Sequence, residues 1–77
     1  MNRNLLRAKV VENGMTLTQL AKELHLDEAT LYRKINGNSD FYRKEIQMIK
    51  HILNLTIDDI RRIFFDDDVA EMRNESL

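Results

Sequence analysis

The sequence predicts an all-α fold, because three of its features favour helices over strands. Proline is absent, and the two glycines, at positions 14 and 37, each follow a stretch with helical spacing. The alternation of β-branched and polar residues that marks strands is nowhere sustained. A chain of 77 residues has room for one domain with a small core.

The first predicted helix covers residues 4–13. Leu6 and Val10 stand four positions apart on one face, and Gly14 can adopt the left-handed conformation that commonly ends a helix. We expect this face to pack on the helices that follow.

The second predicted helix covers residues 17–24 and has a clear start signal. Thr16 is a good N-cap, and Gln19 three residues later completes a capping box. Met15 can also pack on Leu20 as a hydrophobic staple.

The third predicted helix repeats this pattern. Asp27 is a good N-cap, and its carboxylate is stabilised at the positive end of the helix. Leu26 can pack on Leu31, and Asn36 with Gly37 ends the helix. Only three residues, 25–27, separate it from the second helix, so the two helices should cross at a large angle. This is the spacing of a helix-turn-helix.

Two further helices follow a short loop. The fourth, residues 42–53, carries Ile46, Ile49 and Leu53 on one face and ends at Asn54.

The fifth predicted helix opens at Thr56, where Asp59 completes another capping box and Leu55 can pack on Ile60, and continues through Phe65. Its apolar stripe is expected to pack in the core, with the excess available for a subunit interface, and a membrane or cofactor surface is the less favoured alternative. The stripe comprises Ile57, Ile60, Ile63, Phe64 and Phe65.

Charge is divided unequally along the chain, although the net charge is only −1. Residues 1–50 hold nine Lys or Arg against six Asp or Glu, whereas residues 51–77 hold three against seven. A local basic face can still act on phosphates, because salt screens the acidic end over roughly 8 Å. The acidic tail, residues 66–77, has little apolar periodicity and is expected to be flexible.

The helix-turn-helix resembles the Cro and repressor family of phage and bacterial DNA-binding domains. The shared residues are Leu20-Ala21, Leu24, Leu26, Leu31, Ile35 and Asn36-Gly37. The resemblance implies a compact five-helix phage-repressor-like DNA-binding domain over residues 1–65, with the motif at the second and third helices. One position departs from the family: His25 stands where the turn usually has Gly, and a positive φ there costs energy.

In such a motif the second helix enters the major groove. Arg33 is the strongest candidate for a base contact, because its guanidinium can bridge O6 and N7 of guanine. Ala29 can offer its methyl group to thymine. Glu28 can accept a hydrogen bond from cytosine or simply be a solvated acid that the helix dipole favours. Tyr32 completes the set, with Thr30 a weaker candidate; ordinary exposed surface is the alternative for Tyr32 and Arg33.

Phosphate contacts are expected at helix N-termini and at side chains that border the groove. The candidates are Thr16, Thr18, Asn36, Ser39, Arg43 and Lys44. Arg43 and Lys44 open the fourth helix, where cations are mildly unfavourable without an anionic partner, which DNA would supply. The family often has Gln where this chain has Leu17, so that backbone contact is expected to be lost.

Other functions find little support. There is no Cys, and His25 and His51 are too isolated to form a ligand set, so no metal or cofactor is expected. No nucleophile triad or Gly-rich phosphate loop is present, which argues against an enzyme. No long apolar run or signal-peptide pattern occurs, so a cytoplasmic protein without a membrane segment is expected.

The resemblance and the small size favour a Cro-like repressor that binds a double-stranded DNA operator as a homodimer, since one recognition helix covers few base pairs. The alternative is a modulator that binds another protein, for example an antirepressor that captures the phage repressor. The low net charge, Leu17 and the acidic residues Asp66, Asp67 and Asp68 favour that alternative.

Overall fold

The computed structural model describes residues 1–65 of the chain. This part contains five α-helices, and a π-helical segment continues the last of them. The elements are α1 (Arg3–Glu12), α2 (Leu17–Glu23), α3 (Glu28–Ile35), α4 (Arg43–Ile52), α5 (Ile57–Ile60) and η1 (Arg61–Phe65). No strand occurs within residues 1–65, so the all-α, five-helix prediction is confirmed. The tail expected to be flexible, residues 66–77, lies outside the described residues.

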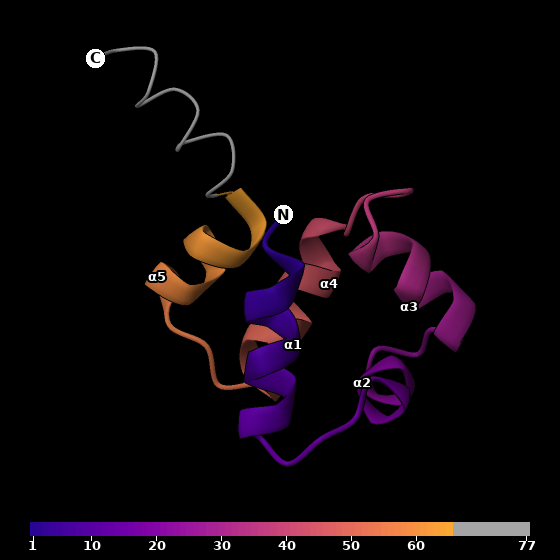
Figure 1. The fold of residues 1–77 in the computed structure, drawn as a ribbon, viewed down its shortest axis with the longest axis horizontal. Helices are drawn as coiled ribbons and strands as arrows, with labels where there is room; N and C mark the ends of the chain where they lie inside the picture. Colours follow the sequence, from indigo (N-terminus) through magenta and orange to yellow (C-terminus); the bar gives the residue numbers. More distant parts are fainter. Residues whose placement is uncertain (66–77) are drawn as a thin grey trace, which may run out of the picture.

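The helices surround α1 (Figure 1). In this view α4 lies behind α1, α2 and α3 lie on one side, and α5 lies on the other. α1 packs on both α2 and η1, and α2 packs on α3. The helix-turn-helix thus forms one flank of the domain, with α3 at its outer edge.

Buried hydrophobic side chains come from α1, α2, α3, α4 and η1 and from the segments between helices, but not from α5. The predicted inward pairs Leu6 and Val10, Leu31 and Ile35, and Ile49 and Leu53 are all buried. The other buried hydrophobic side chains are Leu20, Ala21, Leu24, Leu55 and Ile63. Ile46, which was placed on the same face as Ile49, is only half-buried.

Both predicted capping boxes form. The Thr16 hydroxyl accepts a hydrogen bond from the Gln19 N–H at 3.1 Å, and the Gln19 side chain accepts one from the Thr16 N–H at 2.9 Å. Thr56 and Asp59 make the same reciprocal pair, at 3.0 and 3.1 Å. These bonds satisfy amides that have no partner within the helix, and so they fix where α2 and α5 begin.

The last helix differs from the prediction. An α-helix was expected through Phe65, but regular α-helix ends at Ile60 and the next five residues wind as a π-helix. This segment places Ile63 fully inside the core, and its carbonyl accepts a hydrogen bond of 2.6 Å from the Asn2 N–H. The wider winding therefore accompanies a direct connection between η1 and the residue that caps α1.

The apolar stripe of this helix is only partly in the core. Ile63 is fully buried, and Ile60 and Phe64 are half-buried. Ile57 and Phe65 are 73% and 51% exposed. The prediction that the stripe packs in the core is thus wrong for Ile57 and Phe65. The short α5 and the turn of η1 direct these two side chains to solvent.

Candidate nucleic-acid interface

The turn between α2 and α3 has the geometry of a tight helix-turn-helix. His25 adopts φ 60°, the left-handed conformation expected at this position, and its N–H donates to the Lys22 carbonyl. The next N–H, of Leu26, donates to the Ala21 carbonyl at 2.9 Å. The half-buried Leu26 side chain packs on the core, which fixes the direction in which the chain enters α3.

The outer face of α3 carries the four predicted base-contact residues. Glu28, Ala29, Tyr32 and Arg33 are all exposed, while Leu31 on the opposite face is buried. The helix rotation expected from the sequence is thus confirmed. Contact between these four side chains and bases stays a prediction.

Arg33 is oriented by its neighbour one turn earlier. Its Nη2 donates to the Thr30 hydroxyl at 3.1 Å. A guanidinium carries five N–H donors, so this single bond leaves donors for the edge of a base. Thr30 is half-buried and serves as the partner of Arg33, which suits a supporting role better than a direct base contact.

The start of α2 carries two of the predicted phosphate contacts. Thr16 and Thr18 are exposed, and the Thr16 hydroxyl is engaged in the capping box. Leu17 between them is half-buried and packs against the core. The residue that departs from the family's polar pattern is therefore used for packing.

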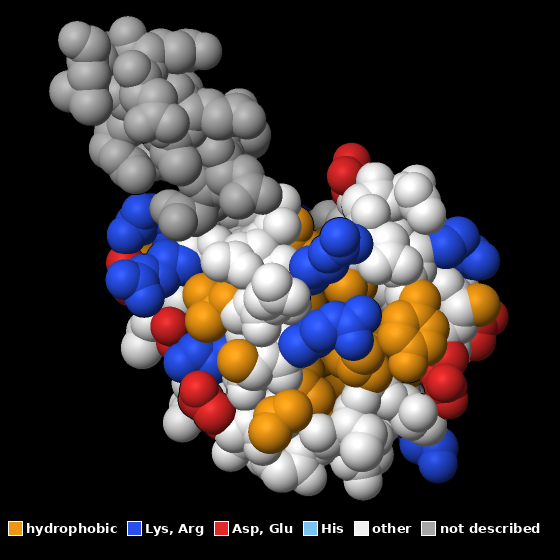
Figure 2. All heavy atoms as spheres, in the orientation of Figure 1, with side chains coloured by type: hydrophobic (Ala, Val, Ile, Leu, Met, Phe, Trp, Pro, Cys, Tyr) orange, Lys and Arg blue, Asp and Glu red, His pale blue; other side chains and the backbone are white. Residues whose placement is uncertain are grey.

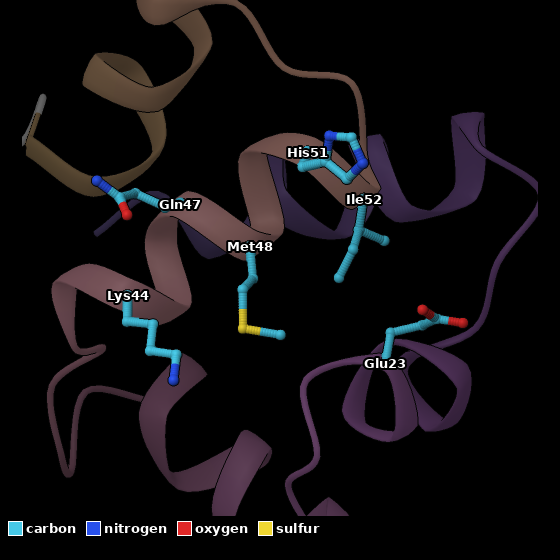
Figure 3. A pocket seen from close by; sticks show the side chains of 6 residues that line it. All are labelled: Glu23, Lys44, Gln47, Met48, His51 and Ile52. Atoms are coloured by element: carbon cyan, nitrogen blue, oxygen red, sulfur yellow. The ribbon is translucent and has the colours of Figure 1, made fainter.

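The structure separates the two cations at the start of α4. Arg43 lines a groove between α4 and α5, together with Phe65. Lys44 lines a cavity of about 420 Å³ between α4 and α2, at the other end of which lies Glu23, with Met48 between them (Figure 3). Both cations are exposed, and they lie along different grooves. Contact between either cation and a phosphate stays a prediction.

The geometry of the turn and the outward face of α3 agree with a comparison against protein-family models. A model of the Cro/C1-type helix-turn-helix DNA-binding domain matches residues 6–66. The chain belongs to this family. Neither the curated proteins nor the solved structures compared with it gave a match. Membership confirms the resemblance and supports a DNA-binding regulator.

Within residues 1–65 the structure contains neither a membrane-spanning helix nor a cluster of metal ligands. None of its helices is long and apolar enough to cross a membrane. No group of three or more His, Cys, Asp or Glu side chains within residues 1–65 is placed to hold a metal ion.

Sequence reasoning missed Arg3 as a neighbour of the DNA-binding face. Its Nη1 donates to the Asn36 side-chain oxygen at 3.2 Å, which brings a cation from α1 to the end of α3. Figure 2 shows Lys and Arg side chains near the middle of the face that includes α1 and α3. Because 33 positions separate Arg3 from Asn36, no local pattern could have indicated this contact.

The sequence also did not predict that Lys34 is buried. This basic residue lies on the recognition helix α3 but is turned inward, and only 6% of it is exposed. Its ammonium lies 3.2 Å from a carboxylate oxygen of Glu45 on α4. Position 34 is three residues after Leu31 and next to Ile35, so it lies on the inner face of α3, but a lysine is ordinarily expected to be exposed.

The carboxylates at two helix starts have lowered pKa values. Hydrogen bonds from Thr30, through its hydroxyl first and its backbone N–H second, hold the pKa of Asp27 below its ordinary 3.8, and the charge of Arg33 adds to this. The backbone N–H of Thr56 is the main cause that lowers the pKa of Asp59. A carboxylate whose pKa is lower in the folded state stabilises that state above its unfolded pKa, and the stabilisation is lost as pH falls through the folded pKa.

We therefore expect the melting temperature to change little from pH 7 to about pH 5 and to fall from there to about pH 3. Asp27→Asn should reduce this fall, because asparagine caps a helix at any pH. Thermal melts followed by circular dichroism would measure the effect. An equally steep acid fall in the variant would mean that Asp27 contributes nothing to the pH dependence.

Proposed function

We propose that the chain is a Cro-like repressor of a phage or prophage, which acts in the bacterial cytoplasm. It occupies a specific operator and thereby blocks RNA polymerase, and it needs no cofactor. The observation that carries this proposal is the outer face of α3, where Tyr32 and Arg33 are exposed on a helix anchored by the buried Leu31 and Ile35. The base contacts of this helix specify the sequence, and the surrounding phosphate contacts position it.

A selection experiment tests the function. The purified protein would be used to enrich duplexes from a pool with a randomised central segment, and the enriched duplex would be titrated in gel shifts at about 50 and 200 mM salt. We expect one enriched sequence, bound far more tightly than unrelated duplex and weakened steeply by salt. Failure to enrich any sequence would contradict the repressor proposal and would favour a modulator that binds another protein.

We propose that phosphate contacts come from Arg43 and Lys44. Alanine at either position should weaken binding to the enriched duplex and to unrelated duplex by the same factor. Each should also reduce the slope of log affinity against log salt by about 0.9, the value for one lost phosphate contact. Lys22→Ala is the matched control, because Lys22 is an exposed cation at the far end of α2. If both slopes equal that of the control, the proposed docking at α4 is wrong.

We also propose that the protein binds its operator as a twofold dimer through the α4–α5 groove. This groove has a volume of about 820 Å³ and is lined by Phe41, Arg43, Ile46, Gln47, Lys50, Ile57, Ile60 and Phe65. Ile57 and Phe65 are the large apolar side chains of α5 and η1 that the core leaves exposed. A dimer would present two recognition helices to half-sites about 34 Å apart.

Replacing both Ile57 and Phe65 by glutamine should abolish the dimer, because it removes apolar area from the proposed interface and little from the core. Sedimentation equilibrium would show monomers at concentrations where the unmodified chain is dimeric. Val11→Gln is a matched control, since Val11 is 72% exposed on α1. An unmodified chain that is monomeric both alone and on the enriched duplex would contradict the dimer.

A further inference from the structure

The side chain of Lys34 joins three segments of the chain. It leaves the last turn of α3, and its ammonium donates to the backbone carbonyl of Asp40 at 2.9 Å. It lies 3.2 Å from a carboxylate oxygen of Glu45 and 4.3 Å from the centre of the Tyr42 ring. The recognition helix, the loop after it and the first turn of α4 therefore meet at one buried ammonium.

Glu45 has a second role at the same oxygen. Its Oε1 accepts a hydrogen bond of 2.8 Å from the Tyr42 N–H, the amide just before α4. The same oxygen faces Lys34. The atom that caps α4 is thus also the atom to which the recognition helix is tied.

We propose that Lys34 and Glu45 form a positioning clasp for DNA recognition. The clasp holds α3 in a fixed register against the first turn of α4, so that base contacts from Arg33 and phosphate contacts from Arg43 reach the duplex together. Arg33 precedes Lys34 and Arg43 lies two residues before Glu45, so each DNA-facing side chain is close to its half of the clasp. This inference rests on the proposed repressor function, and it assigns Lys34 a role on the inner side of the recognition helix.

Stability alone gives little reason for charges at this place. Removing two charges from water is costly, and apolar residues of similar volume often stabilise a buried site equally well. The hydrogen bonds of an ion pair depend on direction and distance, so they hold two helices in one relative position. An apolar contact instead tolerates small shifts of one helix on another. The bonds to Asp40 and Tyr42 add two more fixed points. The charged pair therefore defines the position of α3 relative to α4.

The test is the double variant Lys34→Met, Glu45→Gln of the full chain, which removes the ion pair without leaving one charge buried alone and keeps an oxygen that can accept the hydrogen bond from the Tyr42 N–H. It should melt within a few degrees of the unmodified protein. The ratio of its affinity for the enriched duplex to that for unrelated duplex should fall by about tenfold or more. Interference by phosphate ethylation should be lost at the phosphates bound by α4.

Lys9→Met is the matched control. It removes an ion pair of 3.7 Å between Lys9 on α1 and Asp59 on α5, together with a pair of 3.5 Å between Lys9 and Glu12. Neither α1 nor α5 contains a residue of the clasp, so the affinity ratio should stay unchanged. A double variant that fails to fold, or that folds and keeps the ratio and the ethylation pattern, would overturn the clasp while the unmodified protein still selects a duplex. If the unmodified protein selects none, both the repressor proposal and the clasp are overturned.

Discussion

Replacing Arg33 by alanine is expected to lower affinity for the enriched duplex by about 1–3 kcal/mol, which is roughly five- to 150-fold, because the variant cannot make the bidentate contact with guanine that we propose for Arg33. Affinity for unrelated duplex should fall far less, since a base contact contributes little there. Sequence preference should relax at one base pair in each half-site. Titration against a panel of duplexes, each changed at one base pair, would locate that position.

The control for this variant is Arg62→Ala. Arg62 is also exposed, but it lies on η1 and pairs with Asp58. If Arg33→Ala and Arg62→Ala bind every duplex in the panel equally, Arg33 makes no base contact and α3 is docked in another orientation.

The substitution Leu31→Ala is expected to have a comparably large effect on stability. Leu31 is almost fully buried, and truncation of such a side chain costs about 2–5 kcal/mol. A domain of this size has a total free energy of unfolding of about 4–12 kcal/mol, so a large share would be lost. Urea titration followed by circular dichroism would measure the change.

Operator binding should weaken together with stability in this variant and should return at low temperature or in an osmolyte such as sucrose. The matched control is Val11→Ala, a truncation at an exposed site, which should change stability by less than about 0.5 kcal/mol. A Leu31→Ala variant as stable as that control would mean that α3 is not anchored in the core as described.

The sequence was most informative where a structure depends on neighbouring residues. A capping box spans only four positions, so Thr16 with Gln19 and Thr56 with Asp59 could be recognised directly. The inward rotation of α3 followed from the spacing of its apolar residues. The left-handed turn at His25 was expected from the resemblance.

Features that depend on distant residues could not be predicted in this way. The contact between Arg3 and Asn36 requires α1 to pack beside α3. Burial of Lys34 requires Glu45 to be placed opposite it, and charge patterns along one helix contain no such information. The π-helical winding of η1 likewise depends on how Ile63 enters the core.

The division of α3 into an anchored side and an exposed side has a consequence for how such a protein diversifies. Leu31, Ile35 and Lys34 hold the helix from within, whereas Tyr32 and Arg33 project outward and the core does not depend on them. Substitutions at exposed helix positions typically change stability by no more than about 0.5 kcal/mol. Mutation can therefore retarget the domain to a new DNA sequence without first unfolding it, so that related regulators in one cell can diverge until each ignores the sites of the others.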